Sequence, residues 1–203
     1  GVDRWDKTKP HLLDGPTWSP EHLAAKAFIE ETVPPEGFVA TDDALLAFAG
    51  GRLVPPPFTE ASKKQIELGN FTKDTAVDGM LRYGSEAALF GTGRLERLPN
   101  YEAWIDDVAT ERHEFGDMRA YRLDLPRREP GSAIARFENG IELHGYALSR
   151  SRLSAGGDLT VMLFWKSTGH VPIDHHVFVH LVREDGGMLG QQDGEPVRGE
   201  HPT

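Results

Sequence analysis

The chain has 203 residues, which is enough for one large domain or two small ones. Its 22 basic and 32 acidic side chains give a formal charge of −10, which argues against a nucleic-acid partner and gives no broad attraction to an anionic membrane. The absence of cysteine excludes disulfides and thiolate metal sites, and no apolar run approaches the ~20 residues of a membrane span.

The first elements follow from capping signals. Residues 1–18 are polar and interrupted by proline and glycine, so they predict an extended lead-in. Ser19 followed by Pro20 predicts the start of a helix that Pro34 and Pro35 end. The segment Phe38–Thr41 then predicts a short apolar strand that stops at two acids.

The region around this strand predicts a small α/β domain over residues 19–125. A short helix follows over 44–49, further helices lead to a strand at Ala87–Phe90, and a helix from Pro99 to about 116 precedes a strand at Met118–Leu123. Alternating helices and strands favour a half-Rossmann-like, three-layer domain with a mostly parallel sheet.

A change of pattern follows the proline-rich segment 126–132, which predicts a linker. Residues 133–203 alternate between apolar and polar and are divided by Asn139-Gly140, Gly156-Gly157 and Gly186-Gly187, which are typical turn signals. We expect an antiparallel β-sandwich that is incomplete at its C-terminal end. Both chain termini have the character of cuts, so we expect a piece of a larger protein.

Two strand-end loops supply the candidate ligand-binding residues, which are Asp42, Asp43, Arg52, Thr92 and Arg94. Acids after a strand lie where α/β sheets bind ligands, but Asp42 or Thr41 capping the next helix, with Asp43 complementing its dipole, is the favoured interpretation. For Arg52, the favoured interpretation is a solvated side chain after a helix end, and the alternative is an anion clamp. The glycines around Thr92 fit either a phosphate cradle completed by Arg94 or a turn that needs positive φ.

The histidines of 174–180 suggest a metal site only at first sight. His176 and His180 share one face of the expected strand but lie about 13 Å apart at ~3.3 Å per residue, too far for one ion. We therefore predict no metal site and no cofactor, with Val177, Val179 and Leu181 on the core face. The catalytic motifs considered, a serine nucleophile elbow and a zinc-binding His-Glu-Xaa-Xaa-His run, are missing from the sequence.

Several segments together resemble the extracytoplasmic C-terminal region of bacterial GT-C membrane glycosyltransferases, the dolichyl-phosphate-mannose–protein mannosyltransferase-like family. In the first part these are Val39–Asp43, Gly51–Pro57, Phe90–Leu95 and Leu98–Trp104. The second part is similar to the β-sandwich appended to some of these enzymes, in segments that extend to residue 196. They are Asn139-Gly140-Ile141, Gly145-Tyr146, Trp165, Val177–Leu181 and Gln192–Pro196.

The resemblance implies an accessory region without catalytic residues, because the catalytic acid of that family lies in a membrane-domain loop that this chain does not contain. It implies the extracytoplasmic face of a bacterial membrane, with a membrane-embedded part of the same polypeptide as partner and a glycan or lipid-linked sugar as contact. Two alternatives stay open: a stand-alone carbohydrate- or protein-binding β-sandwich, in which exposed Trp165 or Tyr146 stack on sugars, and a nucleotide-sugar-binding α/β enzyme.

Overall fold

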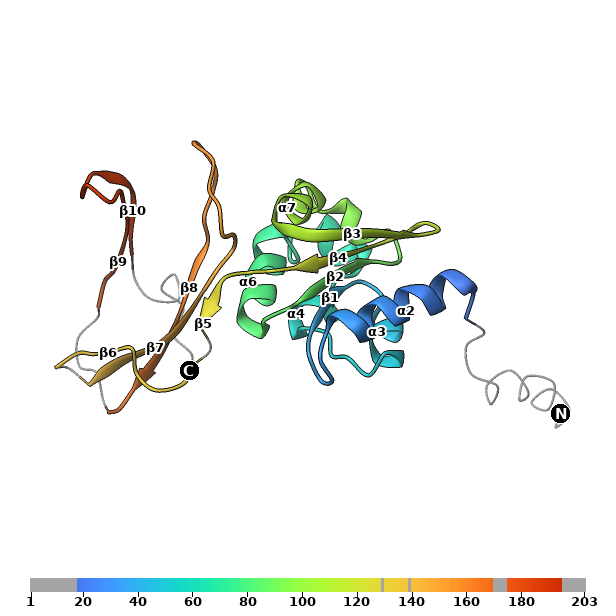
Figure 1. The fold of residues 1–203 in the computed structure, drawn as a ribbon, viewed down its shortest axis with the longest axis horizontal. Coiled ribbons are helices and arrows are strands. Elements are labelled where there is room, and N and C mark those ends of the chain that lie inside the picture. The colour runs from blue at the N-terminus through green and yellow to red at the C-terminus, as the bar shows by residue number, and fades with distance from the viewer. Residues whose placement is uncertain (1–17, 129, 139, 170–174, 195–203) are drawn as a thin grey trace, which may run out of the picture. The chain divides into compact units, whose positions relative to one another are not determined.

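The computed structural model describes residues 18–128, 130–138, 140–169 and 175–194 (Figure 1). By its contacts the chain divides into two units. The first unit takes in the described residues before position 129 together with Gly145–Leu163, and the second takes in those of 130–144 and from Phe164 onward. Of the lead-in predicted for residues 1–18, residues 1–17 lie outside the described residues.

Helix α2 (Pro20–Thr32) forms as its capping signals predict. The Ser19 side chain accepts a hydrogen bond from the backbone N–H of His22 at 3.4 Å, and Pro20 occupies the first helical position, where no N–H is needed. The helix ends at Val33, and its inner face buries apolar side chains such as Phe28 and Ile29.

The sheet of the first unit has the order β1-β2-β4-β3. Strands β1 (Val39–Thr41) and β2 (Ala87–Phe90) are parallel and fully buried. Strand β4 (Met118–Leu123) runs antiparallel to β2, and β3 (Ala109–Phe115) runs antiparallel to β4. The prediction of a mostly parallel sheet is therefore wrong, because two of the three strand pairings in this sheet are antiparallel.

Strand β3 replaces the second half of a predicted helix. Helix α7 (Tyr101–Val108) ends early, and β3 follows it directly. Most of β3 is exposed at the edge of the sheet and carries charged side chains, so it lacks the apolar alternation that marks a half-buried strand. The glycine of the two-residue turn before β4, Gly116, has φ +62°, the geometry of a tight hairpin.

Helices lie on both faces of this sheet (Figure 1). On one face, Phe28 of α2 contacts the rings of His113 and Phe115 in β3. On the other, α7 contacts β3 and β4, and Tyr121 of β4 donates to Glu102 of α7. Within the described ranges, every helix is too short or too polar to span a lipid bilayer.

The crossover between β1 and β2 contains four helices. These are α3 (Ala44–Ala49), α4 (Pro56–Thr59), α5 (Lys63–Glu67) and α6 (Lys73–Tyr83). The helix predicted over residues 60–68 is shorter than expected, because the Ser62 side chain accepts from the Gln65 N–H at 3.3 Å and caps α5 there. The residues 95–97 form one short 3-10 turn, η1 (Leu95–Arg97).

The remaining strands form two further sheets. Strand β7 (Ile141–Leu148) pairs with β5 (Arg127–Arg128), β6 (Ala135–Arg136) and β8 (Val161–Ser167). Strands β9 (Val177–Val182) and β10 (Met188–Gly194) form an antiparallel hairpin. The predicted turns hold, with φ of +79°, +77° and +85° at Gly140, Gly156 and Gly186.

The described residues of the predicted β part form strands and turns, as predicted, and several of their large apolar side chains are exposed. In β9 the alternation is as expected, since Val177 and Val179 are partly buried and Phe178 is 65% exposed. Leu181, expected on the core face, is exposed instead. The structure thus establishes mixed α/β content with three small open sheets.

Candidate functional site

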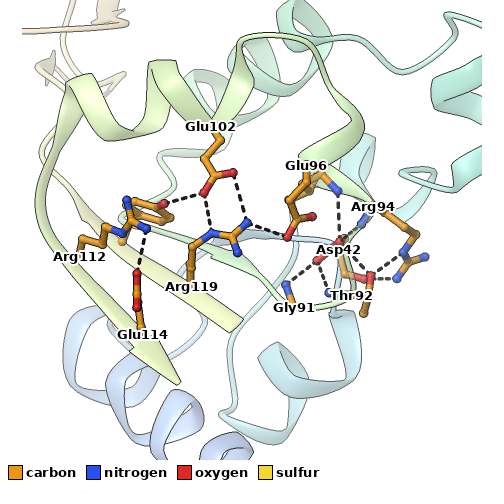
Figure 2. Close-up of polar contacts among 11 residues, drawn as sticks. Asp42, Gly91, Thr92, Arg94, Glu96, Glu102, Arg112, Glu114 and Arg119 are labelled. Atoms are coloured by element: carbon orange, nitrogen blue, oxygen red, sulfur yellow. Dashed lines mark hydrogen bonds and ion pairs between the residues drawn. The ribbon is translucent and has the colours of Figure 1, made fainter. Parts of the chain in front are cut away.

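The Asp42 carboxylate is the centre of the hydrogen-bonded cluster that the two strand-end loops form (Figure 2). Its Oδ1 accepts from the backbone N–H groups of Gly91 at 2.8 Å and Thr92 at 3.2 Å. Its Oδ2 accepts from the Thr92 hydroxyl at 2.8 Å and from the N–H groups of Arg94 at 2.8 Å and Leu95 at 3.2 Å. With the side chain only 4% exposed, both oxygens are committed to the protein itself.

The parallel pairing of β1 and β2 brings these loops together. Thr41 at the end of β1 lies opposite Leu89 of β2, so the residues that follow both strands emerge at the same edge of the sheet. Gly91 permits the close approach, because a Cβ there would lie 2.7 Å from the Asp43 Cβ. The loop after β2 therefore needs this glycine for space.

The side chains of the second loop complete the cluster. The Arg94 guanidinium donates through Nε to the Thr92 hydroxyl at 2.8 Å and through Nη2 to the Asp42 carbonyl oxygen. Converging backbone N–H groups are the usual cradle for a phosphate. Here the Asp42 carboxylate takes the place of that anion, so the candidate residues Asp42, Thr92 and Arg94 lie together but bind one another.

Asp43 caps helix α3. Its Oδ1 accepts from the Leu46 N–H at 3.1 Å, and its own N–H donates to the Thr41 hydroxyl at 2.9 Å. The sequence favoured Asp42 or Thr41 as the cap, with Asp43 complementing the helix dipole. The cap is instead Asp43, which leaves the Asp42 carboxylate for the loop after β2.

Arg52 is buried, and it lies on the ends of helices instead of facing solvent. Its guanidinium donates to the carbonyl oxygens of Val33 at 2.5 Å, Gly50 at 2.7 Å and Glu30 at 2.8 Å. These carbonyls lie at the ends of α2 and α3, where helices leave acceptors unpaired. The expectation of a solvated arginine is wrong, because Arg52 ties α2 to the turn after α3.

A second polar cluster beside the first was not predicted (Figure 2). Arg119 contacts both carboxylate oxygens of Glu102, at 2.5 and 3.2 Å, and Glu96 at 2.9 Å. Tyr121 donates to Glu102 at 3.1 Å, and burial, followed by the Glu102 charge, raises the pKa of Tyr121 to about 12. Arg119 reaches Glu102 because its side chain lies on the face of β4 that packs against α7. The spacing of the two residues in the sequence does not show this contact.

A cleft of about 490 Å³ lies at the opposite end of the first unit's sheet, next to the start of β2. We call it the Ser85 cleft. Its lining residues come from the ends of α2, α6 and β4, from the segments after them, and from β3, β5 and β7. They are Thr32, Met80, Leu81, Gly84, Ser85, Glu86, Thr110, Arg122, Leu123, Asp124, Leu125, Arg127 and Ala147. All of these residues belong to the first unit.

The Ser85 cleft contains two buried hydroxyl groups without a hydrogen-bond partner among the described residues. They belong to Thr32, the last residue of α2, and to Ser85, which follows the left-handed Gly84 at the end of α6. The two residues are 8% and 3% exposed. Neither was singled out from the sequence, because a lone Ser or Thr near a helix end is an unremarkable signal.

His175, His176 and His180 lie among the described residues. Among the described residues, no group of three or more His, Asp or Glu side chains could hold an ion. His180 of β9 and His176, which precedes the strand, are both exposed, and His180 Nε2 is 3.9 Å from Asp193 Oδ1. Asp174 lies outside the described residues.

Comparison with protein-family models, with curated proteins and with solved structures gives no match. The case for a function therefore depends on the residues and their geometry.

Proposed function

We propose that this chain is a non-catalytic accessory region of a polyprenyl-phosphate-sugar-dependent membrane glycosyltransferase, which contacts acceptor or glycan on the extracytoplasmic side of a bacterial membrane. The resemblance of Val39–Asp43 and Phe90–Leu95 to the GT-C family motivates the proposal. The observation that carries it is the hydrogen bonding of Asp42. Its carboxylate accepts five hydrogen bonds from the protein itself, which gives it a structural role.

Glycan contact is assigned to an aromatic pair made of Trp165 on β8 and Phe137, which follows β6. The rings of Phe137 and Trp165 are 6.0 Å apart between centroids, and Trp165 is 37% exposed. Aromatic rings bury large apolar areas and so suit the apolar faces of sugar rings. In this proposal the strands around the pair form part of a β-sandwich, and the first unit is a half-Rossmann-like scaffold.

A glycan array probed with the full chain tests the proposed contact. We expect selective binding that the Trp165→Ala variant weakens by about tenfold or more, because it removes the apolar platform. Leu189→Ala is the matched control, since Leu189 is an exposed apolar residue on β10, and it should bind as the parent chain does. No binding to any glycan, or equal binding by Trp165→Ala, would contradict the proposal.

The parent reading frame tests the membrane part of the proposal. Several apolar spans, with an acidic residue in the first outer loop, are expected in the same polypeptide. A parent gene without apolar spans would overturn the glycosyltransferase assignment. The Phe137–Trp165 pair would then favour the second candidate, a free-standing carbohydrate-binding β module.

The hydrogen-bonded cluster around Asp42 disfavours the third candidate, a nucleotide-sugar-binding enzyme. The backbone N–H groups that would cradle a diphosphate already donate to Asp42. A titration with nucleotide sugars should therefore be flat. Saturable binding that is lost in Asp42→Ala would restore this alternative.

A further inference from the structure

We propose that the Ser85 cleft binds a neutral polyhydroxylated ligand, of the size and chemistry of an uncharged monosaccharide. The inference does not rest on the proposed glycan contact, because every lining residue lies in the first unit, whereas Phe137 and Trp165 lie in the second. The cleft volume of about 490 Å³ falls within the ~300–1,000 Å³ range of small-molecule sites.

The first argument is the pair of buried hydroxyl groups in the lining. Thr32 Oγ1 and Ser85 Oγ have no hydrogen-bond partner among the described residues, and the two residues are 8% and 3% exposed. Most buried polar groups in folded proteins are hydrogen-bonded, so these two hydroxyls have unused hydrogen-bonding capacity. Because a hydroxyl both donates and accepts, its closest complement is a hydroxyl group on a ligand.

The backbone next to these hydroxyls is already hydrogen-bonded, which fixes the wall of the cleft. The Ser85 N–H donates to the Met80 carbonyl oxygen at 3.0 Å, and the Glu86 carbonyl oxygen accepts from the Leu123 N–H at 2.8 Å. Thr32 lies in the last turn of α2, where a threonine hydroxyl can donate to a carbonyl one turn back, but Thr32 Oγ1 makes no such bond. The two hydroxyls are therefore the groups that the wall leaves for a ligand.

The second argument is that the charged side chains of the lining balance one another. Two are arginines, Arg122 and Arg127, and two are acids, Glu86 and Asp124. Arg122 Nε lies 3.2 Å from Glu111 Oε1, and Arg127 donates to a backbone carbonyl oxygen at the end of α6 at 3.1 Å. An anion or a cation in the cleft would meet both attraction and repulsion, so the lining favours an uncharged ligand.

The two acids supply acceptors for the hydroxyl groups of such a ligand. Glu86 follows Ser85 directly, Asp124 follows β4, and both side chains are exposed. Each carboxylate has two oxygens and several lone pairs, so it can accept from neighbouring hydroxyls of one sugar ring. Leu125, which is half-buried in the same lining, adds apolar surface for the C–H groups of the ring. A neutral sugar therefore uses the hydroxyls, the acids and the apolar surface together.

The test is a titration of the ¹⁵N-labelled full chain, followed by amide chemical shifts. Glucose, galactose, mannose and myo-inositol are the neutral probes, and glucose 6-phosphate and glucosamine are the charged comparators. We expect saturable shifts at residues 84–86 and 122–125 with at least one neutral probe, and no tighter binding by either charged compound. No saturable shift with any neutral probe, or tighter binding of a charged one, would overturn the proposal.

Variants then assign the contacts. Ser85→Ala and Thr32→Val each remove one hydroxyl and should weaken binding about fivefold, and Glu86→Gln should weaken it about threefold. The exposed Glu60→Gln in the same unit is the matched control, and it should bind as the parent chain does, as should Trp165→Ala. Unchanged affinity in both hydroxyl variants, or loss of the cleft shifts in Trp165→Ala, would overturn the proposal. A folded spectrum of each variant before titration separates lost binding from lost structure.

Discussion

At the carboxyl end of β2, the Asp42 carboxylate accepts five hydrogen bonds from the loop that follows, whereas at the amino end of the same strand Ser85 leaves a buried hydroxyl without a partner among the described residues. The first region is the one where α/β sheets ordinarily bind ligands. The usual ligand-binding end of this sheet therefore has its polar groups paired within the protein, whereas the other end has a polar group that is still unpaired among the described residues. The position of a site in a fold does not by itself show whether its polar groups are available to a ligand, and the hydrogen bonds of each group must be counted.

The largest expected effect is that of Asp42→Ala. It leaves four backbone N–H groups and the Thr92 hydroxyl without their acceptor, so we expect the free energy of unfolding to fall by about 3–5 kcal/mol. Urea unfolding measures it. Asp43→Ala, which removes only the α3 cap, is the matched control and should cost about 1 kcal/mol. Equal losses of unfolding free energy in the two variants would show that the Asp42 hydrogen bonds stabilise the protein no more than a single helix cap does.

Arg52→Ala comes next. It uncovers three carbonyl oxygens at the ends of α2 and α3, for an expected loss of about 2–4 kcal/mol. The exposed Arg82→Ala on α6 should change stability by less than about 0.5 kcal/mol. A small effect for Arg52→Ala in thermal unfolding would mean that water replaces the guanidinium.

Gly84→Ala extends the comparison to the Ser85 cleft. The added methyl group meets the Arg127 guanidinium as well as the strain of positive φ, so we expect a loss of about 2 kcal/mol. Gly69→Ala has φ +75° with open space around it and should cost about 1 kcal/mol. Urea unfolding of the two variants separates close approach from backbone strain, and identical losses would rule out the Arg127 contact.

Ser85→Ala should have the smallest effect on stability. Its hydroxyl makes no hydrogen bond with the described residues, so the melting temperature should stay unchanged or rise slightly, with a free-energy change within about 0.5 kcal/mol. Thr32→Val offers the same test at the other hydroxyl with nearly equal volume. A clear loss of stability in both variants would mean that the hydroxyls have structural partners.

The local structure of the first unit was predictable because its signals are local. Ser19 with Pro20 starts α2, Thr72 caps α6, and the apolar runs at β1 and β2 become buried strands. Strand β3 was missed because its exposed edge carries charge, although the Gly116-Asp117 pair before β4 is a hairpin signal that identifies it.

The sequence identified candidate residues at the strand ends, but it did not show which groups they contact. Asp42, Thr92 and Arg94 were singled out as strand-end residues, but whether they bind a ligand or one another depends on pairing between positions about 50 residues apart. Arg52 was expected in solvent because nothing nearby in the sequence shows that it reaches Glu30. The Ser85 cleft depends on packing between chain segments, which leaves no local pattern.

The most direct test of the central account is chemical rescue of Asp42→Ala. If the loop after β2 is an anion cradle filled by the protein's own carboxylate, then formate or acetate should raise the melting temperature of this variant. The same anions should leave the parent chain and Arg52→Ala nearly unchanged at equal ionic strength. An equal response in all three proteins would contradict the account, because the anions would then be acting on general stability and not on a vacated cradle.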